Sequence, residues 1–364
     1  MASTLTMVIL EPSTDVPDLP DQPVGVAWPT RDWPTGPLPE HVDIDHVDHL
    51  LDRAFGPTPD PAFGESYATL VVHGGRLVVE RYGSGRDAAT PLLSWSMAKS
   101  VLHAMVGILI EDEQLDPGAA APVPEWSNPA DPRHGISLDH LLRMVDGLQF
   151  NETYEIPEEG AEIAEADWSH AIDMLFGAGK DDHGAYTAAR PVAHPPGTAF
   201  NYSSGTSNVI ARMVCDRIGR GGEATAWMRS NLFDPIGMQS ATPGYDTSGT
   251  FVGSSYVHAT ARDWARFGLL YLRGGLWGHE QIVPRAWVEE CRLPRAVNDD
   301  GAHYGTHWWV AEDGRGTFYA SGYELQRVLC VPTSDLVVVR LGSTPEASYE
   351  EPKVWLEELV TAFD

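Results

Sequence analysis

Residues 92–102 read Leu92-Leu93-Ser94-Trp95-Ser96-Met97-Ala98-Lys99-Ser100-Val101-Leu102, and they mark a change from a short apolar segment to helical spacing. Apolar residues continue at intervals of three and four as far as Ile110, which predicts a helix that begins close to Ser96. Because positions i and i+3 share a helix face, Lys99 can reach the Ser96 hydroxyl. The helix dipole and the free N–H groups at this end would also stabilise negative charge.

The pair Ser96 and Lys99 has two interpretations. In the first, Ser96 is a nucleophile and Lys99 is its base, which requires burial or a neighbouring cation to lower the lysine pKa from about 10.4 towards neutrality. In the second, Ser96 is a helix N-cap and Lys99 is a solvated first-turn cation, and these four residues alone do not decide between the two. A first-turn lysine opposes the helix dipole, which counts against the second interpretation.

Composition indicates an ordinary folded protein. With 364 residues, 43% of them hydrophobic, the chain can bury a large core in one globule or two closely packed lobes. It contains no run of about 18 apolar residues and no signal-peptide pattern at its N-terminus, so we expect a cytoplasmic protein without a membrane span. The chain has three cysteines, an odd number, and they lie far apart at positions 215, 291 and 330. This pattern is typical of reduced, packed thiols and not of a zinc site.

Charge narrows the classes of partner. The formal net charge of −28 argues against nucleic acid and against an anionic membrane, because phosphate binding requires a basic surface. Only three of the 24 basic residues are lysines, at positions 99, 180 and 353, which makes Lys99 more noticeable. These two exclusions leave a small-molecule partner open; the sequence also leaves the oligomeric state open, with a homodimer as one option.

The N-terminal part of the chain is predicted to form an arm followed by a helix. The first 40 residues carry eight prolines without a sustained period, which predicts an extended arm laid over the surface or partly disordered. Residues 40–49 are dense in His, Asp and Glu, yet the apolar positions from Ile44 to Ala54 fit an amphipathic helix. A solvated polar face is therefore favoured over a metal site.

Two β-rich regions lie towards the two chain ends. Residues 68–73 and 76–82 are predicted to form a hairpin around Gly74-Gly75. Four further short strands are predicted within residues 307–341, followed by a helix over residues 352–363, and the segment between the two regions is mostly helical. This order predicts an α+β fold of the α/β sandwich type. An antiparallel sheet built from both chain termini would have flanking helices, and a mostly helical lobe would be inserted between the two β-rich regions. We expect the active site between the sheet and this helical lobe.

The predicted division of the chain follows from this architecture. Residues 1–66 form the Pro-rich arm and the first helix, packed on the core, and residues 67–364 form the main domain. Within that domain we predict a sheet lobe of residues 67–95 and 301–364 and a helical lobe of residues 96–300.

A second segment provides a candidate proton carrier. Tyr202 lies in Phe200-Asn201-Tyr202-Ser203-Ser204-Gly205, just before a predicted helix with buried positions such as Val209 and Met213. A phenol on such a loop can project into a cleft and shuttle a proton near a lysine ammonium. Tyr202 is equally compatible with an ordinary half-buried aromatic.

Four motifs together resemble the serine β-lactamase and penicillin-binding-protein superfamily. They are Ser94-Trp95-Ser96-Met97-Ala98-Lys99-Ser100, Tyr202-Ser203-Ser204-Gly205, the segment from Ala259 to Leu272, and Ala320-Ser321-Gly322-Tyr323. The similarity spans residues 68–345 and is strongest to the branch of family VIII carboxylesterases and 6-aminohexanoate-dimer hydrolases. It implies that residues 67–364 are a serine β-lactamase-like catalytic domain.

The resemblance implies roles for individual residues. Ser96 would be the acyl-accepting nucleophile, Lys99 its base, and Tyr202 the proton donor and acceptor. The backbone N–H groups of Ser96 and Tyr323 would form an oxyanion hole, worth about 3 kcal/mol per donor. Three further motif positions, Ser204, Ser321 and Gly322, would contact substrate. Tyr154, in Asn151-Glu152-Thr153-Tyr154, resembles an additional tyrosine over the cleft of the dimer hydrolases, or it is an exposed loop aromatic.

The chain departs from the β-lactamase pattern at two points. Ser204 stands where asparagine is usual, and Ala320-Ser321-Gly322 replaces Lys-Thr-Gly, so the sequence predicts no cation there to hold a substrate carboxylate. The resemblance therefore implies a serine hydrolase that cleaves an ester or linear amide through an acyl-enzyme on Ser96, without metal or cofactor. The alternatives are a β-lactamase or D,D-peptidase and a catalytically inactive binding protein. An acidic loop over residues 158–167 is expected near the mouth of the site, where it would favour an ammonium group.

Overall fold

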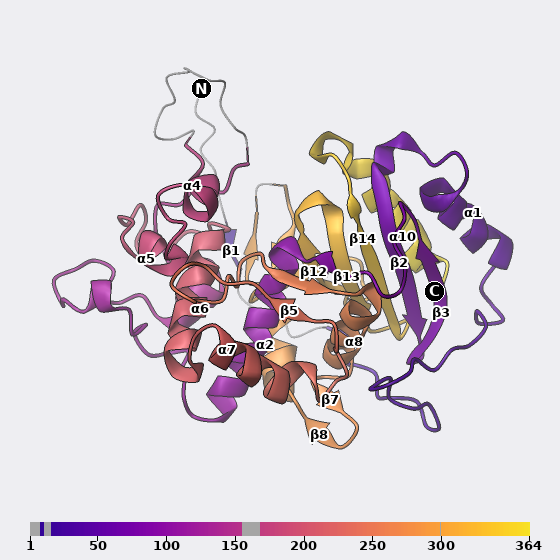
Figure 1. Ribbon diagram of the computed structural model, residues 1–364, viewed down its shortest axis with the longest axis horizontal. Coiled ribbons are helices and arrows are strands. Elements are labelled where there is room, and N and C mark those ends of the chain that lie inside the picture. Colours follow the sequence, from indigo (N-terminus) through magenta and orange to yellow (C-terminus); the bar gives the residue numbers. More distant parts are fainter. Residues whose placement is uncertain (1–7, 11–15, 155–167, 299) are drawn as a thin grey trace.

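A nine-stranded antiparallel sheet forms the centre of the molecule, in the order β1-β9-β10-β11-β12-β13-β14-β2-β3 (Figure 1). The computed structural model describes residues 8–10, 16–154, 168–298 and 300–364. The hairpin β2 (Glu65–His73) and β3 (Arg76–Tyr82) turns at Gly74 and Gly75, both at positive φ, as predicted. Strand β14 (Leu336–Ser343) pairs with β2, so the two ends of the chain build one sheet.

The C-terminal strands continue this sheet outward from β14. They are β13 (Gln326–Val331), β12 (Phe318–Gly322) and β11 (Trp309–Val310). Three two-residue strands that we did not predict extend the edge, namely β10 (His303–Tyr304), β9 (Ala296–Val297) and β1 (Val8–Ile9). Two residues are too few to show an alternating pattern, so sequence periodicity could not detect these strands.

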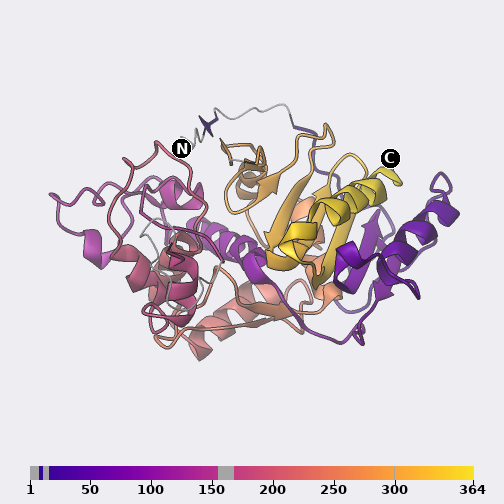
Figure 2. The same ribbon diagram turned by 90° about the horizontal axis from the view of Figure 1, so that it is seen from above.

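Helices cover both faces of the sheet, which confirms the α/β sandwich. On one face, α1 (Ile44–Phe55) and α10 (Glu350–Thr361) bury Leu50, Leu51 and Trp355 against sheet residues such as Val338 (Figure 2). On the other face lies α8 (Ala261–Leu272), where a Cβ on Gly268 would come within 2.6 Å of Val337. Glycine at this position therefore allows α8 to approach the strands closely.

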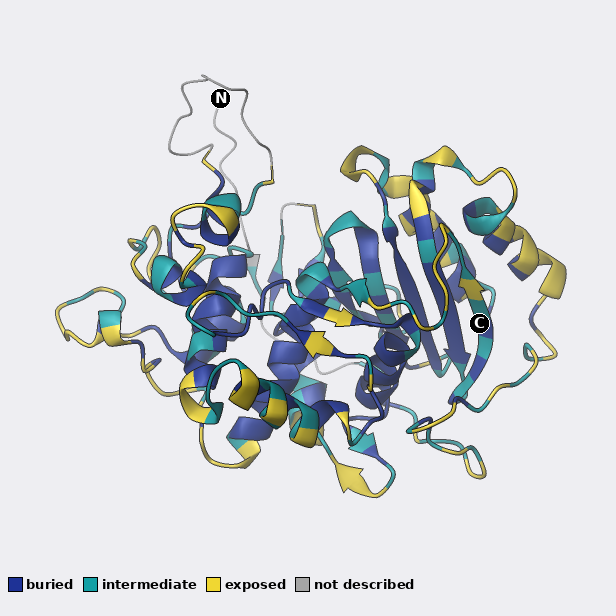
Figure 3. Cartoon of the chain, in the orientation of Figure 1, coloured by how far each residue is buried: buried dark blue, intermediate teal, exposed yellow. Residues whose placement is uncertain are grey.

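The remaining elements surround α2 (Ala98–Glu111) and α6 (Ser204–Ile218), which are buried over most of their length (Figure 3). The other helices here are α3 (Leu138–Leu142), α4 (His170–Phe176), α5 (His183–Ala188), α7 (Gly222–Met228) and α9 (Arg285–Cys291). Two small sheets accompany them, β4 (Leu92–Leu93) with β6 (Val257–Ala259) and β5 (Thr242–Pro243), and β7 (Leu276–Trp277) with β8 (Glu280–Gln281). Short turns of helix include η1 (Pro61–Phe63), η2 (Trp95–Met97), η3 (Pro124–Trp126), η5 (Arg229–Phe233), η6 (Tyr323–Leu325) and η7 (Glu346–Ser348).

The division into a sheet lobe and a helical lobe stays a proposal, and two elements cross it. Both α8 and β9 lie within residues 96–300, yet α8 packs on the main sheet and β9 pairs within it. The sequence order of helices and strands therefore does not coincide with their grouping in space.

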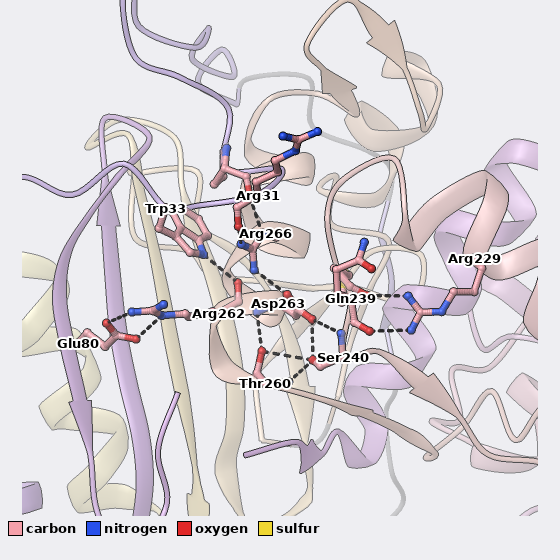
Figure 4. Close-up of polar contacts among 12 residues, drawn as sticks. Arg31, Trp33, Glu80, Arg229, Gln239, Ser240, Thr260, Arg262, Asp263 and Arg266 are labelled. Carbon is pink, nitrogen blue, oxygen red and sulfur yellow. Dashed lines mark hydrogen bonds and ion pairs between the residues drawn. The ribbon is translucent and has the colours of Figure 1, made fainter. Parts of the chain in front are cut away.

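A buried arginine of α8, Arg266, attaches the N-terminal arm (Figure 4). The Arg266 side chain is 8% exposed, pairs with Asp263 at 2.6 Å, and donates to the carbonyl oxygens of Pro29 (2.7 Å) and Arg31 (3.0 Å). In return, Trp33 Nε1 donates to the carbonyl oxygen of Arg262 at 3.3 Å. Because a buried guanidinium needs acceptors for its N–H groups, these carbonyls make the arm part of the core structure.

The first turn of α8 also connects two distant parts of the chain. Arg262 forms a two-pronged ion pair with Glu80 of β3, with N–O distances of 2.6 and 2.8 Å. Asp263 accepts hydrogen bonds from the Ser240 amide and hydroxyl, and Thr260 caps the helix (Figure 4). The 259–272 motif that contributed to the family resemblance therefore has a structural role here.

Three further features complete the fold. Cys215, Cys291 and Cys330 are buried and unpaired. No helix within the described ranges is long and apolar enough to cross a membrane. The same ranges contain no cluster of three or more His, Cys, Asp or Glu side chains arranged to hold a metal ion.

Candidate active site

Ser96 lies in η2, immediately before α2. The N-cap of α2 is Met97, and no side chain caps this helix end. The Ser96 hydroxyl instead accepts a hydrogen bond from Lys99 Nζ at 2.9 Å. The interpretation of Ser96 as a simple helix cap is therefore wrong.

The residue before Ser96 has an unusual backbone conformation. Trp95 has φ +46°, in the left-handed region that bulky residues rarely adopt, at a typical cost of about 1–3 kcal/mol. Its indole donates to Glu324 Oε2 at 3.3 Å, and its ring meets the Tyr323 ring edge-on at 5.7 Å. These contacts hold the sharp turn that presents Ser96.

Lys99 is enclosed and fully hydrogen-bonded. Its side chain is buried, with the residue 2% exposed, and Nζ lies 2.9 Å from Ser96 Oγ, 3.0 Å from Ser204 Oγ and 3.1 Å from the Ser254 carbonyl oxygen. Burial lowers the pKa of Lys99 to about 8, and the negative charge of Glu152 opposes part of this shift. Lys99 is therefore not a solvated first-turn cation, and a substantial fraction of it is neutral near pH 8.

Tyr202 lies directly before Ser203, the N-cap of α6. Lys99 Nζ is 4.9 Å from the centre of its ring, and Tyr202 and Ser96 line the same cleft. Burial and the charge of Glu152 raise the pKa of Tyr202, so the phenol keeps its proton at neutral pH. The ring also packs 5.4 Å from Trp309, so Tyr202 is both a half-buried aromatic and a neighbour of Ser96.

The end of β12 forms the opposite wall of the site. A Cβ on Gly322 would lie 2.3 Å from the Ser94 carbonyl oxygen, so only glycine allows the strand to meet the chain before Ser96. Tyr323 follows at the start of η6. The backbone N–H groups of Ser96 and Tyr323 donate to no acceptor within the part of the chain that the structure describes.

A buried arginine supports the turn that follows Tyr323. Glu324 and Leu325 both have left-handed φ values, +59° and +63°. Arg340 is 1% exposed and donates to the carbonyl oxygens of Glu324 (2.8 Å) and Leu325 (3.0 Å). Two successive left-handed residues are costly, and these hydrogen bonds help to hold the turn in place.

These elements enclose a cleft with a volume of about 460 Å³. Its lining consists of Ser96, Glu152, Thr153, Tyr154, Tyr202, Trp309, Ser321, Gly322, Tyr323, Arg327, Glu346 and Tyr349. Six of these were candidate site residues in the sequence, and the other two candidates, Lys99 and Ser204, lie buried directly behind them. All eight are thus brought together, while the acidic loop of residues 158–167 lies outside the described residues.

Tyr154, at the end of the segment 151–154, lines the cleft. Its hydroxyl donates to Glu152 Oε1 at 2.6 Å, and its ring lies 5.1 Å from that of Tyr323. Although Tyr154 is 37% exposed, it is a lining residue and not a loop aromatic remote from the site.

Three charged lining residues were missed from the sequence, namely Glu152, Arg327 and Glu346. Glu152 was overlooked beside Tyr154, and its side chain accepts hydrogen bonds from the Ser204 amide (2.7 Å) and the Ser204 hydroxyl. Arg327 lies opposite Ser321 in the β12–β13 pairing, and its Nη1 donates to Ser321 Oγ at 2.6 Å. Aligning the two predicted strands that became β12 and β13 would have placed Arg327 opposite Ser321. No local sequence pattern indicates Glu152.

Arg327 corrects our expectation that the third motif lacks a cation. The guanidinium comes from the neighbouring strand, so inspection of residues 320–322 alone could not reveal it. Its hydrogen bonds go to Ser321 Oγ and to the backbone carbonyls of Gln326 and Gly322, none of which carries a charge.

Comparison with known proteins agrees with the fold and the motifs. The Beta-lactamase family model matches residues 62–361, and the chain belongs to that family. This is a serine hydrolase family with esterases and amide hydrolases among its members. The 6-aminohexanoate-dimer hydrolase of Paenarthrobacter ureafaciens is 28% identical over 295 residues, which cover 77% of this chain and 73% of that enzyme.

Solved structures share the fold at lower identity. A Bacillus anthracis protein assigned as a 6-aminohexanoate-dimer hydrolase gives a TM-score of 0.71 at 22% identity, covering 96% of this chain and 90% of the other. A family VIII carboxylesterase gives a TM-score of 0.66 at 13% identity, covering 90% of this chain and 99% of the other.

Proposed function

We propose that this protein is a serine hydrolase that cleaves an ester or a linear amide bond through an acyl-enzyme on Ser96. The observation that carries the proposal is the buried Lys99, whose Nζ lies 2.9 Å from Ser96 Oγ and whose pKa is lowered to about 8. A serine beside a base that is partly neutral at physiological pH is an activated nucleophile. Relatives that bear the names of an amide hydrolase and a carboxylesterase support the two substrate classes.

The first half of the reaction forms the acyl-enzyme. Neutral Lys99 accepts the Ser96 proton as Oγ attacks the substrate carbonyl carbon, and the carbonyl oxygen becomes an oxyanion. The N–H groups of Ser96 and Tyr323 would bind this oxyanion, each contributing about 3 kcal/mol, and their lack of an acceptor in the described chain supports this role. Tyr202 donates its proton to the leaving oxygen or nitrogen as the C–O or C–N bond breaks, and Lys99 returns a proton to Tyr202.

The second half regenerates the enzyme. A water molecule loses a proton to the same groups and attacks the acyl carbon, and Ser96 regains its proton as the acid product leaves. The raised pKa of Tyr202 supports its role as donor, because a phenol that stays protonated can protonate an amide nitrogen. Tyr154, which lines the cleft and donates its own proton to Glu152, would accept a hydrogen bond from that nitrogen.

A β-lactamase or D,D-peptidase is the second candidate, and Arg327 favours it. The guanidinium lines the same cleft as Ser96, and its hydrogen-bond partners are uncharged. A substrate carboxylate is the natural partner for such a group. The chain nevertheless has Ser204 in place of the usual asparagine, which weakens this candidate.

Intact-protein mass spectrometry tests both candidates and the inactive-binding alternative. The protein is incubated with a panel of p-nitrophenyl esters, linear amides and penicillins, and turnover of the esters and of nitrocefin is followed in parallel. We expect ester and amide adducts that are absent in Ser96→Ala. Penicillin adducts with nitrocefin turnover would favour the second candidate, and the absence of adducts and turnover with every compound would support a binding protein. An Ser96→Ala variant that matched the parent enzyme would overturn the assignment of the nucleophile.

A further inference from the structure

Glu152 reaches the catalytic lysine through one intermediate hydroxyl. The Ser204 hydroxyl donates to Glu152 Oε1, and the Ser204 amide donates to Glu152 Oε2 at 2.7 Å. A hydroxyl has a single proton, so Ser204 Oγ must act as an acceptor towards Lys99 Nζ, which lies 3.0 Å away. The hydrogen bonds therefore run in one direction, from Lys99 through Ser204 to the Glu152 carboxylate.

This direction fixes where the lone pair of a neutral Lys99 points. A neutral amine has two N–H groups and one lone pair, whereas Lys99 Nζ has three neighbours. The Ser254 carbonyl oxygen can only accept, and Ser204 is made an acceptor by Glu152. Both N–H groups are thereby used, and the lone pair faces Ser96 Oγ, from which it must take a proton.

Charge gives Glu152 a second effect on Lys99. The three groups around Nζ are two hydroxyls and a carbonyl, all uncharged, and Lys99 is 2% exposed. When Lys99 accepts the Ser96 proton, a positive charge forms in a site that excludes water, which is costly without a nearby anion. Glu152 supplies the negative charge two hydrogen bonds away.

We propose that Glu152 is a positioning residue which acts on Lys99 through Ser204, directing the lysine lone pair at Ser96 and balancing the charge that Lys99 gains during acylation. The proposal rests on the function proposed above. A purely structural role for Glu152, as a cap of α6, is less consistent with the contacts, because Ser203 already caps this helix by accepting from the Thr206 amide at 2.9 Å.

The test compares Glu152→Gln, Ser204→Ala and the double variant by the pH dependence of kcat/KM for a p-nitrophenyl ester. In Glu152→Gln we expect the plateau value of kcat/KM to fall roughly 10- to 100-fold. This is part of the rate enhancement that a general base typically contributes, because Lys99 would remain present but less well oriented. We also expect the acid limb to move to lower pH, because the Glu152 charge raises the lysine pKa. The kcat/KM of the double variant should lie within about threefold of that of the slower single variant. The two effects should not add, because both substitutions break the same row of hydrogen bonds from Lys99 to Glu152.

A matched control and two further readouts make the outcome decisive. Glu346→Gln removes a carboxylate that lines the same cleft but has no hydrogen bond to Lys99, Ser204 or Glu152 among the described contacts. The acid limb of its pH profile of kcat/KM should therefore stay in place. Melting temperatures report whether each variant folds. The proposal is overturned if Glu152→Gln changes only the melting temperature or KM, or if the two single effects multiply in the double variant. Ser96→Ala, measured beside them, tests the proposed function separately, because its activity does not depend on what Glu152 does.

Discussion

Gly322 and Ser94 meet backbone to backbone, and this contact positions the end of β12 beside the turn that carries Ser96. A Cβ at residue 322 would approach the Ser94 carbonyl oxygen to 2.3 Å and Gln326 Cβ to 3.0 Å. This contact brings together the two backbone N–H groups of the proposed oxyanion hole, because Tyr323 follows Gly322 and Ser96 lies two residues after Ser94.

Gly322→Ala should therefore reduce activity with little loss of fold. The added methyl group must push β12 away from Ser94, and a displacement of about 1 Å can lower the rate about 100-fold. Steady-state kcat/KM for a p-nitrophenyl ester measures the effect. Gly135→Ala is the control, because no atom lies within 4 Å of a Cβ there and activity should be unchanged. Equal activity in both variants would contradict the proposed position of the oxyanion hole.

Activity should rise with pH through about pH 8. Lys99 acts as a base only when neutral, and its pKa is lowered to about 8, so kcat/KM should increase through that value and level off above it. Tyr202 should remain protonated across this range, because its pKa is raised. A pH–rate profile on a non-ionising ester checks the prediction, with Lys99→Met as the inactive reference. A profile that is flat between pH 6 and 9 would argue against Lys99 as the base.

Arg327 should determine preference for substrates with a carboxylate in the acyl group. Replacing it by methionine removes a hydrogen-bonding cation, typically worth about 1.5–3 kcal/mol towards a charged group. We expect kcat/KM for p-nitrophenyl hemisuccinate to fall about 10- to 100-fold, while kcat/KM for p-nitrophenyl butyrate changes little. Arg327→Lys should keep part of the preference. Parallel losses on both esters would mean that Arg327 only supports Ser321.

The arm attachment predicts a stability effect far from the site. Arg266 donates to Pro29, Arg31 and Asp263 at once, and a lysine ammonium cannot reproduce this fork. Arg266→Lys should lower the free energy of unfolding by about 1–3 kcal/mol, measured from urea denaturation. Arg86→Lys, at an exposed arginine, is the control and should have an effect below about 0.5 kcal/mol. Equal midpoints for the two variants would show that the arm adds nothing to stability.

Local sequence patterns predicted the parts of the site that lie close together along the chain. The spacing of Ser96 and Lys99 is one helical turn, and the geometry of that turn brings them together wherever the helix lies. The hairpin of β2 and β3 was predicted for the same reason, since a Gly-Gly turn and alternating residues are local signals.

Through-space relationships were beyond the reach of these patterns. Arg327 meets Ser321 only because of strand register, and Glu152 meets Ser204 only because a loop folds over the start of α6. The position of α8 on the sheet, and not within a separate helical lobe, depends likewise on packing that no single segment encodes. The sequence therefore indicates the reacting groups better than the groups that tune them.

The three buried cysteines have a practical consequence for experiments on this protein. Burial of Cys215, Cys291 and Cys330 keeps these thiols away from reagents and raises their pKa, which disfavours the reactive thiolate. In the native protein, an electrophilic probe should therefore encounter Ser96 with little competition from sulfur. Once the chain opens, the same thiols become accessible, so a brief pulse of a maleimide would count unfolded molecules without any engineered label.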